Sequence, residues 1–232
     1  MGKPPARFGG WVSGSIAFRS FFARPTFRGM ILDLPYNFHW IEPGEAARSA
    51  QAYAGFLGSF LRAHDIRALV NLRGSNPGHF WWQYETRTCL RAGVLHIDAK
   101  LNSRQLPTRA MIVALLDAYD ASPRPFLIKC SGGQDRTSFA AGLYLLHRHG
   151  PQAFALAERQ FAAWPYLHCP KRHQRWLRLF LNFARERSSG TSLRNWTENH
   201  YYAPEFRSWL EARGEGQSFL GLYGVPRRGI GS

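Results

Sequence analysis

A cysteine and an arginine with two glycines between them mark the place in this chain where chemistry is expected. The stretch reads Cys130-Ser131-Gly132-Gly133-Gln134-Asp135-Arg136-Thr137. A strand-like apolar run precedes it, and a helix-like run follows it. A loop that leads from a strand into a helix aims backbone N–H groups at one point, and the helix dipole adds positive potential there. The stretch therefore predicts an anion-binding loop with a thiol at its base.

The residue types in this loop fit hydrolysis of a phosphate monoester. The glycines allow the backbone to approach a ligand closely, and a guanidinium can bind two phosphate oxygens at once. The positive field favours the thiolate of Cys130, which is the nucleophilic form. The predicted phosphate ligands are the backbone of Ser131, Gly132, Gly133 and Gln134, and the side chain of Arg136. The Thr137 hydroxyl is expected to help the sulfur leave in a second step.

The stretch resembles the Cys-x5-Arg-Ser/Thr signature of the cysteine-dependent protein tyrosine and dual-specificity phosphatases. The segments "RSAQ" (48–51), "VNLRG" (70–74) and "AGVLHI" (92–97) are similar to the atypical dual-specificity group of bacteria, plants and fungi. The resemblance covers about residues 36–150. It implies an α/β fold with a central, mostly parallel sheet flanked by helices, and a cysteinyl-phosphate intermediate formed without a cofactor or metal. Rhodanese loops, the nearest similar pattern, place cysteine and arginine one residue closer.

The resemblance also implies a carboxylic acid that protonates the leaving alcohol, and two aspartates are candidates. Asp98 follows the predicted strand "VLHI" at the start of a loop, which is where the family usually carries its acid. Asp135 lies inside the signature, where many phosphoinositide phosphatases also read "DRT". It serves there either as the acid or as a group that orients the loop. We expect Asp98 to be the acid and keep Asp135 as its rival.

Two cations near the loop are further candidates for binding substrate. The family generally has a histidine directly before the cysteine, whereas this chain has Lys129. Lys129 is expected to lower the thiolate pKa by its charge or to extend outward. Arg73, at the carboxyl end of the strand "LVNL", is expected on the rim where α/β sheets bind ligands. There it would bind substrate or pair with a carboxylate.

Charge and cysteine content narrow the partners. The chain has 30 Lys and Arg against 15 Asp and Glu, a formal net charge of +15. This excess suits an anionic partner: a phosphorylated protein, an inositol phosphate or phosphoinositide, or an acidic lipid surface. Charge and aromatic content alone would also suit nucleic acid, which the loop disfavours. Three widely spaced cysteines favour a reducing compartment over a disulfide scaffold, so we expect a cytoplasmic protein, and no spacing suggests a metal site.

Hydrophobic periodicity predicts alternating strands and helices, the pattern of a covered parallel sheet. Strands are expected at 36–44, 66–74, 93–99 and 124–130, and helices at 45–64, 79–92, 106–121, 136–150, 151–163 and 171–187. Residues 1–30 are expected to form a basic arm, 31–187 the phosphatase-like domain and 188–232 a C-terminal extension. The alternative to an enzyme is a phosphate-binding module that keeps the loop but lacks a working acid.

Overall fold

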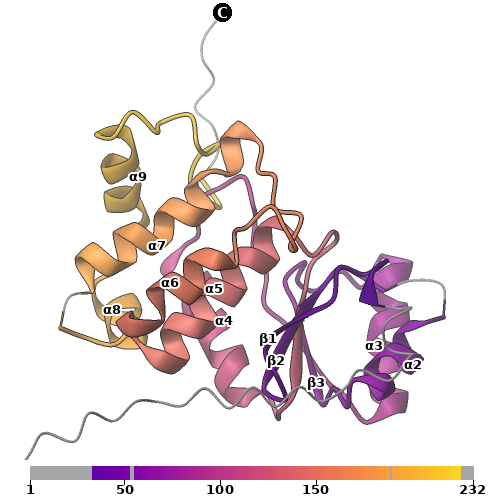
Figure 1. Ribbon diagram of the computed structural model, residues 1–232. Helices are drawn as coiled ribbons and strands as arrows, with labels where there is room; N and C mark the ends of the chain where they lie inside the picture. The colour runs from indigo at the N-terminus through magenta and orange to yellow at the C-terminus, as the bar shows by residue number, and fades with distance from the viewer. Residues whose placement is uncertain (1–32, 53–54, 189, 226–232) are drawn as a thin grey trace, which may run out of the picture.

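The computed structural model describes residues 33–52, 55–188 and 190–225 (Figure 1). The arm expected at 1–30 lies outside them. The strands of the described residues form one sheet in the order β1-β2-β5-β3-β4. The strands are β1 (His39–Glu42), β2 (Ala46–Ser49), β3 (Ala68–Asn71), β4 (Leu95–Asp98) and β5 (Phe126–Lys129). Within this sheet only the β1–β2 pair is antiparallel, so the expected α/β fold with a mostly parallel sheet is confirmed.

The inner strands are short and buried on both faces, as covered parallel strands are. Because side chains alternate along a strand, each strand supplies both sides of the sheet. Val70 and Ile128 pack into a large core with the later helices, whereas Leu69 and Leu127 pack into a smaller core on the other face. The sheet is therefore the layer that separates two hydrophobic cores.

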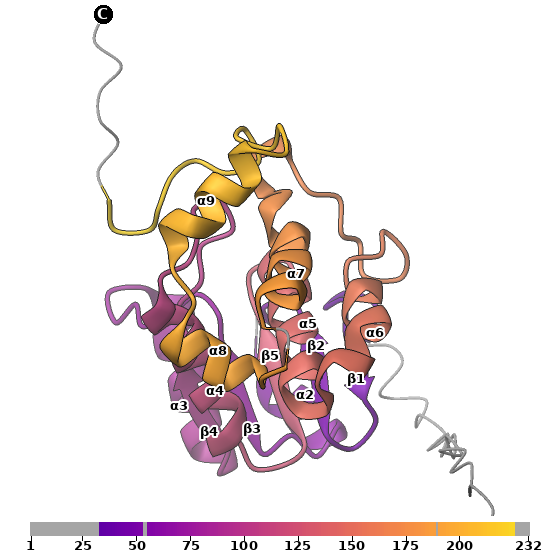
Figure 2. The ribbon, with the colours of Figure 1, turned by 90° about the vertical axis from the view of Figure 1, so that its left-hand side faces the viewer.

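Helices cover both faces of the sheet unequally. The smaller core lies under α2 (Leu57–Ala63) and α3 (Phe80–Ala92), which Figure 1 shows on the right. The other face carries the larger group of helices, which lies in front of the sheet in Figure 2. Its members are α4 (Arg109–Ala121), α5 (Asp135–His149), η1 (Pro151–Ala153), α6 (Phe154–Arg159), η2 (Arg172–Gln174), α7 (Trp176–Arg187), α8 (Leu193–Asn199) and α9 (Ala203–Glu211).

The helix expected over residues 45–64 is wrong in its first part. Residues Ala46–Ser49 form β2, which lies between β1 and β5, and the helix begins only at Leu57. Small apolar residues at 46, 47 and 50 match a helical repeat as well as a buried strand. The pairing of β2 with two neighbours decides between them, and the sequence pattern does not contain that tertiary information.

The described part of the C-terminal extension, residues 190–225, packs on the rest of the fold. Helix α8 packs on α4, and α9 packs on α7. Trp196, Phe206 and Leu210 are buried members of the large core. After α9 the chain returns to the segment before α4, where Leu106 and Leu222 form an isolated parallel bridge. Among the described residues, no helix is long and apolar enough to span a membrane.

Candidate active site

The predicted anion-binding loop lies at the carboxyl end of the central strand. Strand β5 ends at Lys129, and α5 begins at Asp135. We call residues 130–136 the cradle loop. The side chain of Cys130 lies at its base with 3% of its surface exposed, whereas Ser131 and Gly132 are exposed. The loop thus opens to solvent above a nearly buried sulfur.

Gly133 is the residue that shapes the loop. Its φ of 64° is in the left-handed region that favours glycine. A Cβ atom there would lie 2.5 Å from the backbone nitrogen of Ala50, so a side chain has no room. The carbonyl of Gly133 accepts hydrogen bonds from Nδ2 of Asn37 at 3.1 Å and from Nη2 of Arg48 at 3.0 Å. These donors hold the carbonyl on the far side, and the Gly133 amide is left to face the Cys130 sulfur.

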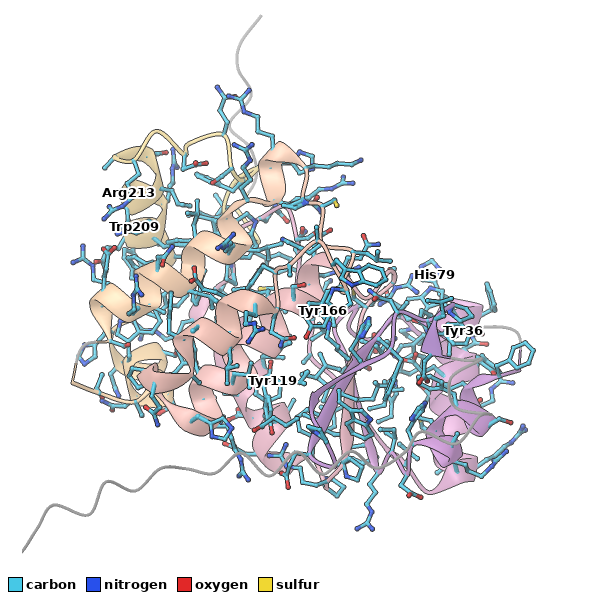
Figure 3. The ribbon with its side chains drawn as sticks, in the orientation of Figure 1. Tyr36, His79, Tyr119, Tyr166, Trp209 and Arg213 are labelled. Carbon is cyan, nitrogen blue, oxygen red and sulfur yellow. The ribbon has the colours of Figure 1, made fainter. Side chains whose placement is uncertain are left out.

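Arg48, the first residue of the segment "RSAQ", braces the loop from β2. Its guanidinium is fully buried and also donates to the Ser138 hydroxyl at 2.9 Å and to the Gln160 carbonyl at 2.9 Å. The ring of Tyr166 lies 4.2 Å from the guanidinium carbon, between the helices and the sheet (Figure 3). Burial, opposed by Tyr166 and Cys130, lowers the pKa of Arg48 to about 10. Arg48 therefore carries a positive charge at neutral pH.

The environment of Cys130 favours its thiolate. Burial alone would raise the pKa of the thiol. The charge of Arg136, the Thr137 hydroxyl and the amides of Gln134 and Gly133 outweigh burial, so that the pKa lies below its usual value. These donors converge on one sulfur from the loop and the first turn of α5. The arrangement is that of an activated nucleophile.

Arg136 and Thr137 lie on the first turn of α5 beside the sulfur. The Arg136 guanidinium donates to the Ser131 hydroxyl at 3.2 Å and to the Leu72 carbonyl at 3.5 Å, which folds it back over the loop. The Thr137 hydroxyl is buried and makes no hydrogen bond of ordinary geometry within the described residues. Its closeness to the sulfur nevertheless helps lower the pKa of Cys130.

Asp98 lies two strands away from the cradle loop. It pairs in register with Asn71, which pairs with Lys129. With strands about 4.8 Å apart, the backbone of Asp98 is roughly 10 Å from that of Lys129. Its carboxylate accepts from Nδ2 of Asn71 at 2.6 Å and from the Trp82 indole at 3.0 Å. In this arrangement Asp98 ties β4 to β3 and α3.

Asp135 lies on the cradle loop itself. One carboxylate oxygen accepts from Nε2 of Gln174 at 2.9 Å, and the other lies 3.4 Å from Nδ1 of the buried His168. Nε2 of Gln174 also donates to the hydroxyl of Ser103, at 3.1 Å. Asp135 is therefore joined to the two segments that border α5, at 99–106 and 168–175.

Lys129 does not extend into solvent. Its side chain is 1% exposed, and its ammonium lies 2.7 Å from Oε1 of Glu85 and donates to Oε1 of Gln51 at 2.8 Å. A buried cation held in this way is not available to a phosphate above the loop. The structure thus places Lys129 behind the cradle loop, and the substrate contact expected for it is not seen.

Arg73 lies on the same side of the sheet. Its guanidinium carbon stands 3.3 Å from the ring centroid of Trp81, and Nη1 donates to Gln51 at 3.3 Å. Stacking on Trp81 fixes the plane of the guanidinium and leaves the charge at the carboxyl end of β3, which is the position expected for a rim residue.

Several residues of the site escaped the sequence reasoning. Asn37, Gln51, Glu85, His168 and Gln174 contact the loop or the side chains that hold it. Gln51 belongs to the segment "RSAQ" but had no role assigned to it, and Glu85 also carried a usable signal. It lies four residues after Trp81 and four before Cys89, on the buried face of α3, and a glutamate on such a face needs a buried partner. Within the described part of the chain, no group of His, Cys, Asp or Glu could hold a metal ion.

Comparisons with known proteins give weak likenesses. No protein-family model matches the chain, and no curated protein matches it. Among solved structures it is similar to TpbA of P. aeruginosa, with 17% identity over 71% of this chain and 92% of that one and a TM-score of 0.49. Tk-PTP gives 18% identity, 66% and 97% coverage and a TM-score of 0.48.

A third similar structure is the core catalytic domain of the PP-IP phosphatase SIW14 from S. cerevisiae. It shares 17% identity over 77% of this chain and 93% of that chain, with a TM-score of 0.42. Likenesses at these TM-scores carry no argument about this chain. The function proposed below therefore depends on the cradle loop and on the residues that hold it.

Proposed function

We propose that the chain is a phosphate monoester hydrolase that works through a cysteinyl-phosphate on Cys130. The observation that carries this proposal is the convergence of Arg136, Thr137 and two backbone amides on one nearly buried sulfur whose pKa is lowered. A structural cysteine in a strand-to-helix turn has no need of these donors. A nucleophile at the base of a phosphate site needs all of them.

In the first step the Cys130 thiolate attacks phosphorus. A sulfur–phosphorus bond forms, the bond from phosphorus to the ester oxygen breaks, and the alcohol leaves with a proton from a carboxylic acid. Arg136 and the loop amides stabilise the charge that gathers on the other phosphate oxygens. In the second step water attacks the cysteinyl-phosphate and gives up a proton to the carboxylate that the first step left. The sulfur–phosphorus bond breaks, inorganic phosphate is released, and the thiolate of Cys130 is restored with help from the Thr137 hydroxyl.

We assign the acid role to Asp135, in preference to Asp98. Asp135 belongs to the cradle loop, and contacts with Gln174 and His168 fix its carboxylate. Asp98 is also held by two side chains, Asn71 and Trp82, but it lies two strands away, with its backbone roughly 10 Å from that of Lys129. This reverses the order expected from the sequence, where position along the chain was the main guide.

The two aspartates are separated by comparing pH–rate profiles of Asp135→Asn and Asp98→Asn. With an aryl phosphate that has a poor leaving group, the rate of Asp135→Asn should no longer depend on a protonated acid. Asp98→Asn should keep it, with a lower thermal stability because a carboxylate that ties β3 to β4 is gone. The reverse result would restore Asp98 to the acid role.

The substrate class is proposed as phosphorylated protein or inositol phosphate and phosphoinositide. Arg104 follows Ser103, whose hydroxyl accepts from Gln174, and the backbone N–H of Lys171 donates to Gln174. Gln174 in turn donates to Asp135, so both cations belong to segments that are joined to the cradle loop. Their charges favour a substrate with more than one anionic group. A phosphate-release panel of phosphopeptides, inositol phosphates and phosphoinositides would choose among these.

The proposal itself is tested by turnover of a generic aryl phosphate. We expect release of phosphate by the wild type and none by Cys130→Ser, with Cys169→Ser as the matched cysteine control. Cys169 is exposed and lies outside the cradle loop, so its variant should act as the wild type does. Binding of phosphate without turnover by the wild type would instead favour a non-catalytic phosphate-binding module.

A further inference from the structure

A buried ion pair lies directly behind the nucleophile. Lys129 is the residue before Cys130, and Glu85 reaches it from α3. Both side chains are 1% exposed. Taking two charges out of water costs several kcal/mol per ion, and a pair of this kind seldom stabilises a fold as well as apolar side chains do. Stability of the fold alone therefore does not explain the Lys129–Glu85 pair, and a role in the reaction would.

The pair belongs to a network that ends at the cradle loop. Oε1 of Gln51 accepts from the ammonium of Lys129, and Nε2 of Gln51 donates to Glu85. The backbone N–H of Gln51 donates to the Ser131 carbonyl at 3.2 Å. The side chain and the backbone of Gln51 thus connect the ion pair to the first residue after the nucleophile.

Among the described residues, the other titratable groups that face the pair are His96, Arg73, Cys130 and the buried Cys89. Glu85 also lies 2.9 Å from Nε2 of His96, which reaches it from β4. Arg73 faces Lys129 from the end of β3 and disfavours its charged form, whereas Cys130 and Glu85 favour it. The ring of Trp81 lies 5.4 Å from the ammonium. Glu85 is therefore the principal group that keeps a cation in this position.

We propose that Glu85 is a positioning residue for the reaction: it holds Lys129 as a buried cation behind Cys130, where the cation favours the thiolate and, through Gln51, fixes the start of the cradle loop. This inference rests on the proposed function, because it assigns a role in preparing the same nucleophile. It also accounts for a lysine in the position where the resembling family generally has a histidine.

Burial makes the cation depend on its partner. Burial, opposed by the Glu85 charge and hydrogen bond, lowers the pKa of Lys129 to about 8. The pair remains charged at neutral pH because Glu85 is present. Without that carboxylate, burial and Arg73 would act on Lys129 with less opposition, so the pKa of Lys129 would fall further and its neutral form would gain.

The sign of one measurement separates this role from a direct effect of Glu85. Removing a negative charge near a thiol should by itself lower the thiol pKa. If Glu85 acts by keeping Lys129 charged, its loss should instead raise the pKa of Cys130. A purely structural role for Glu85 predicts lower stability and no directed shift of this pKa.

The experiment measures the rate of Cys130 alkylation by iodoacetamide against pH, in a Cys169→Ser background. The remaining cysteine, Cys89, is fully buried.

Glu85→Gln should move the midpoint of the profile upward by about half a pH unit or more. Lys129→Met should move it in the same direction. In the Lys129→Met background Glu85→Gln should no longer raise the midpoint, because only the direct, lowering effect of losing the carboxylate is left. Glu205→Gln, which removes an exposed carboxylate paired with Arg187, is the control and should leave the profile unchanged.

Removing one partner of a buried pair can unfold a protein. If Glu85→Gln does not fold, the double variant Glu85→Gln/Lys129→Met decides, because it leaves no charge unpaired. A midpoint at or below that of the wild type in either folded variant overturns the inference. A wild type whose Cys130 titrates like an ordinary exposed thiol would instead overturn the proposed function, so the two failures can be told apart.

Discussion

At the scale of single residues, the reactivity of Cys130 depends on a balance between burial and a few donors. Burial opposes the thiolate, and Arg136, Thr137 and two amides outweigh it. Thr137 is the donor whose part can be tested separately, because its side chain is small and fully buried. Its hydroxyl has no other partner of ordinary geometry among the described residues.

Replacing Thr137 by valine keeps the volume and removes the hydroxyl. Hydrogen bonds to charged groups are worth about 1.5–3 kcal/mol, so hydrolysis of the cysteinyl-phosphate should slow roughly tenfold to a hundredfold. With a good leaving group, Thr137→Val should show a burst of alcohol followed by slow turnover. Stopped-flow measurement would reveal it. A loss of the first step with no burst would place Thr137 in the attack instead.

Cys89 offers a prediction about pH. Burial, with a smaller contribution from Glu85, raises the pKa of this thiol from 9.0 to about 12. A raised pKa gives stability that is present below the unfolded value and lost as the pH rises through the folded one. Between about pH 9 and 12 the free energy of unfolding should therefore fall more steeply in the wild type than in Cys89→Ala.

Urea denaturation at several alkaline pH values measures this slope. Cys169→Ala is the matched control, because Cys169 is exposed and should leave the slope unchanged. Equal slopes for Cys89→Ala and the wild type would mean that the thiol is not held protonated by burial.

At the scale of elements, the cradle loop is fixed from outside its own segment. Strand β2 supplies Arg48, and the residues before β1 supply Asn37; both bind the carbonyl of Gly133. Backbone of the turn after β2 closes on Gly133, where only a hydrogen fits. Gly133 is therefore required by its surroundings, whereas the neighbouring Gly132 has room for a side chain.

Gly133→Ala and Gly132→Ala form a matched pair. The first places a methyl group against the backbone of Ala50 at a positive φ, and should destabilise the fold by about 1–3 kcal/mol and weaken phosphate binding. The second meets nothing closer than the Gln134 side chain at 3.7 Å, so thermal stability should be close to that of the wild type. Equal stability of the two variants would contradict the loop geometry.

Most of the elements were predictable because their patterns are local. An apolar run, two glycines and helical spacing predicted a strand at 124–130, a glycine loop and a helix at 136–150, and the structure has β5 and α5 within one or two residues of these bounds. Strand β2 was not predictable, because its four residues fit the spacing of a helix as well as that of a strand. Only its pairing with β1 and β5 decides that it is a strand. For the same reason the sequence offered no sign that Gln174 and His168 would meet Asp135 across the fold.

At the scale of the whole molecule, residues 190–225 pack on the main core and are not an appendage. Phe206 from α9 is fully buried and contacts the rings of Phe180, Phe183 and Trp176. The sequence showed only that this region is rich in aromatic residues. Helix α9 packs on α7, and α7 begins two residues after Gln174. The C-terminal region therefore supports the segment whose Gln174 donates to Asp135.

Phe206→Ala should therefore lower the free energy of unfolding by about 3–5 kcal/mol, as loss of a large buried aromatic side chain does. Tyr202, at 61% exposure, is the matched control, and Tyr202→Ala should have little effect. A single cooperative transition in both proteins is expected, because the extension shares the main core. A separate early transition, with activity retained after it, would show that the extension folds as an independent unit.

The most direct test of the central claim is to trap the covalent intermediate. The wild type, mixed with an aryl phosphate and quenched in acid within one turnover, should carry one phosphoryl group, and peptide mass spectrometry should place it on Cys130. Thr137→Val should accumulate more of it. A hydrolytically active protein that never carries phosphate on Cys130, or carries it on another residue, would contradict the account.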